Sequence, residues 1–307
     1  MKRIKSPFLS PIDDIEQWQQ LSHQQYSHNS LLSLRNDWHR FLAFCYSIHT
    51  PALPAQPTTV VRYLNEMSKS RKYSTLRRYL ISINTVHKLA HQPEPSRFRE
   101  VQRFLKSQQV IKQHDHIQAD ALHRSHLDKL YLQLHLSEER KDKRDLAIWH
   151  LMFETLMKRS ELISLNYHHF SPTTNVVVLE DSEYTLSPRT SELIHQWLND
   201  ADISHGPLFR GLDRHGNISD RNMDPSAIYR VFRRASELLG LPKHITFSGQ
   251  SPRVGASKAL ANDGLTLTEI QVAGRWKSPA MPAQYLGKTE KSEQEKQRFK
   301  KQKQWLK

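Results

Sequence analysis

The stretch SGQSPRVGASKALANDGLTLTEIQVAGRWKSPAMPAQYLG, residues 248–287, carries the most informative pattern of the chain. It holds Arg253 in a Ser-Pro-Arg-Val-Gly turn, Trp276 two residues after a glycine, and Tyr285 near its end. An arginine fork can hold two oxygens of an oxyanion, and a tyrosine hydroxyl can act as a nucleophile. We therefore treat these three residues as a candidate active site.

The composition predicts a polyanionic partner. The chain has 307 residues, enough for two domains, and 45 Lys and Arg against 31 Asp and Glu give a net charge of +14. Such an excess is typical of proteins that bind nucleic acid. A membrane surface is the alternative partner, but no apolar run approaches the roughly 20 residues that a span needs. The first residues also lack the apolar core of a signal peptide.

Cysteine and histidine usage argues against disulfides and metal sites. With the single Cys45, no disulfide can form within the chain, and no Cys/His cluster has zinc spacing. The 18 histidines are scattered, which is more often surface composition than metal binding. We expect a cytoplasmic, nucleoid-associated protein without a metal site and without membrane association.

The first 112 residues have the pattern of a small helical domain. Residues 27–46 repeat apolar side chains, such as Leu31, Leu34 and Trp38, at helical spacing, and a serine just before them can cap the helix. Three further helices are predicted over 59–70, 74–92 and 95–110.

Charge is uneven within this N-terminal domain. Between residues 69 and 112 there are eleven Lys or Arg and only two acidic residues, Glu94 and Glu100. Most charge runs are simply solvated helix faces. The imbalance favours phosphate binding over that reading, because a phosphate backbone attracts clustered cations.

A polar, aperiodic segment over residues 113–122 is predicted as a linker to a second domain over 123–287, followed by a basic tail or helix over 288–307. The one clear β signal lies in residues 175–188, where a branched run, a polar turn and a second short run indicate a hairpin. Helices are predicted over 124–136, 143–157, 190–199, 224–240, 252–263 and 267–273.

The ordered set of motifs resembles the C-terminal catalytic box of the tyrosine recombinases, the phage-integrase family, and within it the Cre-like subgroup. The Ser-Gly-x-Ser-x-Arg-Val-Gly turn, the Ala-Gly-x-Trp turn and the late tyrosine recur there with the same spacing. The segment PLFRGLDRHGNISDRNMDPSAIYRVFRRA and the N-terminal helices resemble the same subgroup, so the resemblance covers nearly the whole chain. It implies a mainly α fold, with a four-helix core-binding (SAM-like) domain and a mixed α/β catalytic-type domain that carries a small antiparallel sheet.

The resemblance also implies a chemistry. In this family a tyrosine oxygen attacks the scissile phosphate of double-stranded DNA and stays attached to the 3′ side, while the 5′ oxygen leaves and later attacks back. The phosphotyrosine keeps the bond energy, so no ATP, no metal and no other cofactor is expected. Two arginines neutralise the nonbridging oxygens, and a lysine on a β-hairpin turn protonates the leaving oxygen.

Four residues match family positions. Tyr285 matches the nucleophile, Arg253 the second arginine, and Trp276 the residue whose indole N–H binds the phosphate. Glu161, in MKRSELISL, matches a structural glutamate. Any one of them alone could be a surface or packing residue, but their common spacing favours the site.

Three positions depart from the family pattern. Lys158 stands three residues before Glu161, where an arginine is expected, and its neighbour Arg159 would point about 100° away on a helix. Gln250 stands where a histidine or lysine is expected, and an amide cannot carry a proton to a leaving group. From residue 160 to 188 there is no lysine or arginine. The expected hairpin turn instead carries acidic residues, Glu180, Asp181 and Glu183.

Two functions of different class stay open. The first is a site-specific recombinase or integrase that acts through Tyr285 and is impaired. The second is a catalytically inactive DNA-binding regulator or accessory subunit with a recombinase fold. The family pattern favours the first, and the acidic hairpin favours the second. A basic RNA-binding protein is a distant third, because no RNA-module motif occurs, and a gel shift comparing duplex DNA with RNA separates it.

The resemblance implies that two domains clamp the duplex and that a C-terminal helix docks into the neighbouring protomer, giving a homo-tetramer on DNA. The tail ends with Trp305 and Leu306, apolar residues on a hydrophilic segment, and a disordered basic tail is the alternative. Each DNA-contact candidate could equally be a solvated surface residue. The candidates are Arg77, Arg78, Lys88, Tyr229, Arg230, Arg233, Arg234 and Lys243.

Overall fold

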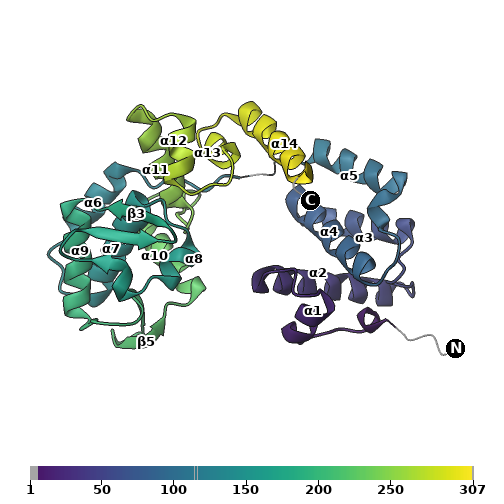
Figure 1. Cartoon of the computed structure of the whole chain (residues 1–307), viewed down its shortest axis with the longest axis horizontal. Coiled ribbons are helices and arrows are strands. Elements are labelled where there is room, and N and C mark those ends of the chain that lie inside the picture. The colour runs from purple at the N-terminus through teal and green to yellow at the C-terminus, as the bar shows by residue number, and fades with distance from the viewer. Residues whose placement is uncertain (1–5, 114, 116, 306–307) are drawn as a thin grey trace. The chain divides into compact units, whose positions relative to one another are not determined.

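The computed structural model describes residues 6–113, 115 and 117–305, and it divides into two compact units, Met1–Ile117 and Gln118–Lys307. Both units are mainly helical, and two small antiparallel sheets lie in the second (Figure 1). The predicted fold class, mainly α with a small antiparallel sheet, is confirmed. Within the described ranges, no helix is long and apolar enough to cross a membrane.

The first unit packs its helices around an aromatic core. Its helices are α1 Ile15–Leu21, α2 His28–Ser47, α3 Pro57–Ser68, α4 Tyr73–Leu89 and α5 Arg99–Ile111, with 3₁₀ turns at Pro7–Leu9 and Pro95–Arg97. Helix α2 begins where the side chain of Ser27 accepts the backbone N–H of Ser30. Trp38 and Tyr63 are fully buried in the core. The apolar period of α2 therefore faces inward, as its sequence predicts.

Two details of this unit differ from the sequence expectation. Helix α1 was not expected, because its seven residues span only two turns and bury the single residue Trp18, whose indole donates to the carbonyl of Ile12. The helix expected over 95–110 is divided, since a 3₁₀ turn ends at Arg97 before α5 begins. Short elements of this kind leave too few residues to show a period.

The second unit is built around α7, Arg140–Glu154, which packs against α9 and α11. Eleven of its 15 residues are buried, including Trp149, so it is the central helix of the unit. The surrounding helices are α6 Arg124–Leu134, α8 Arg159–Ser164, α9 Pro188–Asp200, α10 Pro225–Leu238, α11 Ser251–Asn262, α12 Leu267–Ala273, α13 Ala280–Tyr285 and α14 Thr289–Trp305.

A three-stranded antiparallel sheet contains the predicted hairpin. Its order is β1 Phe170–Ser171, β2 Val176–Leu179 and β3 Ser182–Thr185, with Val177 opposite Tyr184. The turn between β2 and β3 consists of Glu180 and Asp181, and Glu180 has a φ of 52°. A 3₁₀ turn at Tyr167–His169 precedes β1.

A second hairpin pairs β4 Arg210–Leu212 with β5 Ile218–Asn222. It was not expected, because β5 reads ISDRN and lies mostly exposed, without an apolar alternation. Its loop is held by Asp213, whose carboxylate accepts the backbone N–H groups of His215 and Asn217. Local hydrogen bonding to an aspartate, rather than burial, therefore shapes this hairpin.

Candidate active site

Arg253 is positioned by the first turn of α11, which packs directly on the backbone at Leu122. The N–H of Leu122 donates to the carbonyl of Ser251 over 3.1 Å. A Cβ added at Gly255 would lie 1.7 Å from the carbonyl oxygen of Leu122. The glycine of the Arg-Val-Gly sequence therefore permits this close approach, and the approach fixes where Arg253 stands.

Trp276 is positioned by a second glycine. A Cβ at Gly274 would lie 1.9 Å from the Trp276 ring, so the indole folds back over this glycine. The Arg253 guanidinium stacks 4.3 Å from the centre of the indole, and its Nη2 donates to the Gly274 carbonyl over 2.8 Å. The two motifs thus hold each other through cation–π contact and a hydrogen bond.

Tyr285 ends α13 and meets the same indole. The two ring centres are 5.8 Å apart in an edge-on arrangement, and Tyr285 is 5% exposed. Its backbone carbonyl accepts the side-chain N–H of Gln118 over 3.2 Å. Helix α13 is tied to α14 because the Ser292 hydroxyl donates to the Ala280 carbonyl over 2.7 Å. The phenol therefore lies inside the unit rather than on its surface.

The electrostatics of Arg253 and Tyr285 follow from this burial. Burial raises the pKa of the Tyr285 phenol, and the Arg253 charge only partly offsets it. Burial also lowers the pKa of Arg253, an effect opposed by Tyr285 and Glu161. The Nη1 of Arg253 is buried and has no hydrogen-bond partner within the described part of the chain. A phosphate oxygen would satisfy this donor.

Lys158 and Glu161 form a second part of the site around the start of α8. The carboxylate of Glu161 accepts the backbone N–H of Lys158 over 2.7 Å and its ammonium over 2.6 Å. The Lys158 ammonium also lies 3.7 Å from Glu180 of the hairpin turn. Lys158 was expected within a helix, but α7 ends at Glu154 and Lys158 caps α8 with an extended backbone. Because Lys158 lies outside the helix, the expected helical offset of about 100° between it and Arg159 does not hold.

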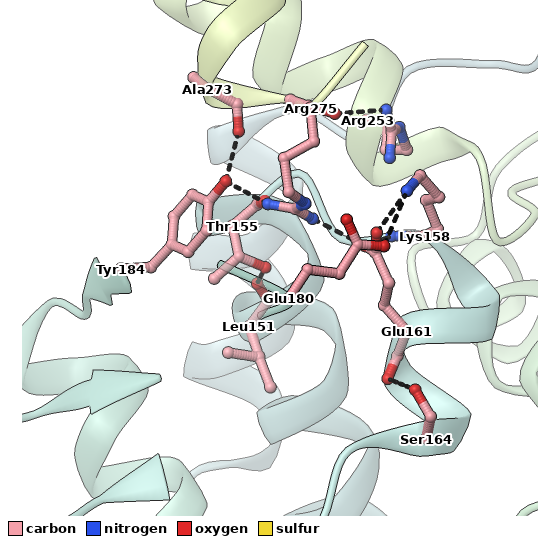
Figure 2. Close-up of polar contacts among 11 residues, drawn as sticks. Leu151, Thr155, Lys158, Glu161, Ser164, Glu180, Tyr184, Arg253, Ala273 and Arg275 are labelled. Atoms are coloured by element: carbon pink, nitrogen blue, oxygen red, sulfur yellow. Dashed lines mark hydrogen bonds and ion pairs between the residues drawn. The ribbon is translucent and has the colours of Figure 1, made fainter. Parts of the chain in front are cut away.

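Arg275 is a member of this cluster that the sequence argument missed. Its Nη2 donates to Glu161 over 2.7 Å, and its Nη1 contacts the Thr155 carbonyl and the Tyr184 hydroxyl. Figure 2 shows the guanidinium between Tyr184 and Glu161, with Lys158 approaching the same carboxylate. Arg275 directly precedes Trp276 and is far along the chain from residues 160–188, where a hairpin cation was expected.

These contacts set the charge state of Glu161. Burial acts to raise the pKa of Glu161, but hydrogen bonds from Arg275 and Lys158 outweigh it and hold that pKa below its usual value. Burial likewise opposes the charge of Arg275, yet the bond to Glu161 raises the pKa of Arg275. The cluster therefore contains the carboxylates of Glu161 and Glu180 and three cations, because Arg253 lies on its other side (Figure 2).

Gln250 and the hairpin turn lie at the edge of this arrangement. Gln250 is exposed at the N-cap of α11, and its backbone N–H donates to the Ser248 hydroxyl over 3.3 Å. The turn presents Glu180 toward Lys158. The structure thus brings Arg253, Trp276 and Tyr285 together, and Lys158 with Glu161. Among the described residues, no group of three or more His, Cys, Asp or Glu could hold a metal ion.

Seven of the eight DNA-contact candidates are exposed, and Arg234 is the exception. Arg77, Arg78 and Lys88 are exposed on α4, although Arg78 pairs with the buried Asp37. Arg234 is half-buried on α10 and bridges two aspartates of α7, so it holds the unit together instead of presenting a free charge. The remaining candidates are exposed on or just after α10: Tyr229, Arg230, Arg233 and Lys243.

A separate cavity of about 570 Å³ lies among α6, α7, α11 and the start of α9, and no residue of the candidate site lines it. His150 of α7 lines it, and burial lowers the pKa of this histidine to about 4. Glu154 also lines the cavity, and it is anchored by the hydroxyls of Ser187 and Thr190 over 2.6 Å each. This cavity belongs to the frame that carries α11, not to the site.

Comparison with known proteins places these motifs in a family. The model of the phage integrase family matches residues 121–292. The recombinase Cre of Escherichia phage P1 is 23% identical over 291 residues, covering 85% of this chain and 84% of that protein. An integrase/recombinase XerD homologue of Selenomonas ruminantium is 25% identical over 283 residues, covering 84% and 81%.

Solved structures share the fold at lower identity. The XerH site-specific recombinase bound to a palindromic difH substrate aligns with a TM-score of 0.63 and 13% identity, covering 96% of this chain and 86% of that one. The Tn1549 transposon integrase in complex with circular intermediate DNA aligns with a TM-score of 0.62 and 14% identity, covering 87% and 93%.

Proposed function

The chain belongs to the phage integrase family, and we propose that it is a tyrosine recombinase that binds double-stranded DNA and exchanges strands through a 3′-phosphotyrosine at Tyr285. The cluster of Arg253, Trp276 and Tyr285 carries this proposal. Arg253 has a buried N–H group without a partner among the described residues, and its guanidinium and the Tyr285 phenol contact the same indole. The Tyr285 phenol gives up its proton to water as its oxygen attacks phosphorus, the bond from phosphorus to the 5′ oxygen breaks, and that oxygen takes a proton from water.

The reaction is proposed to be slow. Lys158 is held by Glu161 and faces Glu180, so its charge is less available to the nonbridging oxygens. Gln250 offers no proton, and the hairpin turn repels phosphate. Loss of one charge-stabilising donor typically costs about 10²–10³ in rate, although such losses need not multiply. Together these departures predict cleavage well below that of a complete site.

A catalytically inactive DNA-binding regulator or accessory subunit is the second candidate. One observation favours it: Tyr285 is 5% exposed and must move before it reaches any phosphate. In either function the exposed cations of α4 and α10 would grip the duplex backbone.

Assembly into a homo-tetramer on DNA is part of the proposal. Helix α14 follows Tyr285 closely and is tied to α13 through Ser292. The side chain of Trp305, and Leu306 as a whole, lie outside the described residues. Truncation after Lys288 should abolish cooperative DNA complexes in a gel shift while single-protomer binding persists. Unchanged cooperativity would count against docking through this helix.

The decisive experiment avoids the need for a known target sequence. A library of duplexes with 5′-phosphorothiolate linkages traps covalent complexes, because a sulfur leaving group needs little help from a general acid. We expect weak capture on this library, very little on ordinary DNA, and none with Tyr285→Phe on either.

A repaired variant separates the two candidate functions. A triple variant should raise capture on ordinary DNA. It combines Lys158→Arg, which restores the bidentate guanidinium, Gln250→His, which restores a side chain that can transfer a proton, and Asp181→Lys, which restores the cation of the hairpin turn. Intact DNA binding without capture, even after this repair, would favour the regulator. Rapid turnover of ordinary DNA by the unaltered protein would contradict the proposed impairment.

A further inference from the structure

We propose that Arg275 is a positioning residue: it acts as the permanent counterion of Glu161 and thereby releases Lys158 to bind the scissile phosphate. This inference deepens the proposed function and rests on it. Pairing of Arg275 with Glu161 would allow Lys158 to bind the phosphate at a position where the family pattern has an arginine.

The contacts of the two cations differ in a way that assigns their roles. The Arg275 side chain is 8% exposed and joins α8, the end of α7 and β3 through Glu161, Thr155 and Tyr184. The Lys158 side chain is 41% exposed, and its ammonium contacts only the carboxylates of Glu161 and Glu180 among the described residues. Arg275 is therefore fixed, whereas Lys158 is the exposed cation of the pair and must leave its two carboxylates to bind another anion.

Charge balance explains why the release depends on Arg275. The Glu161 carboxylate is buried, and a buried carboxylate without a partner is strongly unfavourable. If Lys158 were its only counterion, moving the ammonium to a phosphate would leave Glu161 unpaired. With Arg275 in place, Glu161 stays paired when Lys158 moves, and only the exposed Glu180 still competes with the phosphate for the Lys158 ammonium.

The contacts of residue 275 suit the two terminal nitrogens of an arginine, although its backbone conformation favours glycine. Arg275 has a φ of 54°, a backbone region that side chains other than glycine seldom adopt. Its two terminal nitrogens serve different partners at once: Nη2 binds Glu161, while Nη1 binds Thr155 and Tyr184. A lysine has a single nitrogen and no planar fork, so it could not make these contacts together.

The experiment compares Arg275→Gly, Glu161→Gln and the double variant with the unaltered protein. Glycine suits the positive φ, and glutamine removes the charge that holds Lys158. Arg144→Lys is the matched control, because Arg144 is a buried arginine, 7% exposed, that pairs with Asp145 away from the site. Thermal unfolding of each variant reports whether the fold is retained.

Two readouts are made on each protein. The first is the ¹³C NMR signal of reductively methylated Lys158, assigned with Lys158→Arg, during titration with inorganic phosphate. The second is covalent capture on the phosphorothiolate library. Arg275→Gly should weaken the phosphate response of Lys158 roughly tenfold and lower capture by about 10²-fold. The double variant should recover most of the phosphate response, and the Arg144 control should match the unaltered protein in both readouts.

Other results of these experiments would contradict either the role of Arg275 or the proposed cleavage. An unchanged phosphate response in Arg275→Gly, or no recovery in the double variant, would overturn the inference. Should Arg275→Gly fail to fold, Glu161→Gln alone still tests it: a weaker phosphate response at Lys158 contradicts it, and an equal or stronger response supports it. Absence of capture by the unaltered protein, with the phosphate response of Lys158 intact, would sink the proposed cleavage and leave the role of Arg275 standing.

Discussion

Replacing Gly255 by alanine tests how α11 is seated, and two opposing effects can be weighed. In a helix interior, alanine is favoured over glycine by about 0.5–1 kcal/mol. The new Cβ would lie 1.7 Å from the carbonyl oxygen of Leu122, whereas ordinary contact begins at 3.4 Å. Both sides of the clash are backbone, so α11 or the Leu122 segment must move by most of that difference.

The clash is expected to win. Overpacking of this kind costs about 1–3 kcal/mol, occasionally more, and the shift also strains the hydrogen bond from Leu122 to Ser251, worth about 1 kcal/mol. After the helix preference is subtracted, Gly255→Ala should destabilise the second unit by about 2–3 kcal/mol, which lowers Tm by about 5–10 °C for a unit of this size. Arg253 lies one half-turn away, so phosphate binding should weaken as well.

Calorimetry of the full chain measures this shift. Gly249→Ala is the control, because its Cβ would meet nothing closer than 3.6 Å, and its Tm should change little. An unchanged or higher Tm for Gly255→Ala would show that α11 does not press on Leu122, and the reasoning about the position of Arg253 would fall with it.

Three further predictions use other features of the molecule. The DNA affinity of the full chain should fall steeply as salt is raised, because the eleven cations between residues 69 and 112 would displace counterions from the DNA. A filter-binding titration with a flat salt response would show that these helices do not bind the DNA backbone. Trp276→Ala should free the Arg253 guanidinium and expose Tyr285, so its phenol should react faster with a tyrosine-directed reagent while covalent capture falls. Burial lowers the pKa of His150 from 6.5 to about 4, so the neutral ring favours the folded state. The free energy of unfolding should be highest above about pH 6.5 and should fall by up to about 3 kcal/mol as the pH drops through 4. His150→Gln should remove this pH dependence from the denaturation profile.

The parts of the fold that repeat a period were predictable from sequence. Helix α2 follows its apolar spacing to within a residue at each end, and the β2–β3 hairpin lies where the branched run and the polar turn indicate. Elements without a period were not. Helix α1 is too short, and the β4–β5 hairpin depends on the hydrogen bonds of Asp213, which a hydrophobic pattern does not reveal.

The candidate site shows the same division. The resemblance to the tyrosine recombinases predicted Arg253, Trp276 and Tyr285 as a group from their spacing, and the two glycines explain why that spacing matters. Spacing could not show that Arg275 turns inward, because the direction depends on its positive φ. The pairing of Arg234 with two aspartates of α7 is equally hidden, since these residues are far apart along the chain. The role of a residue that depends on its contacts with distant parts of the chain cannot be predicted from motif spacing.

The inward position of Tyr285 has a consequence for a genome. If the chain binds DNA as proposed, its net charge of +14 would bring it to phosphates along the whole chromosome, and an exposed nucleophile would risk breaking strands at chance encounters. Here the phenol is covered, its carbonyl is held by Gln118, and α13 is fastened to α14 through Ser292. Under the proposed function, the protein would contact many DNA sites without cutting them, because cleavage would first require Tyr285 to be uncovered.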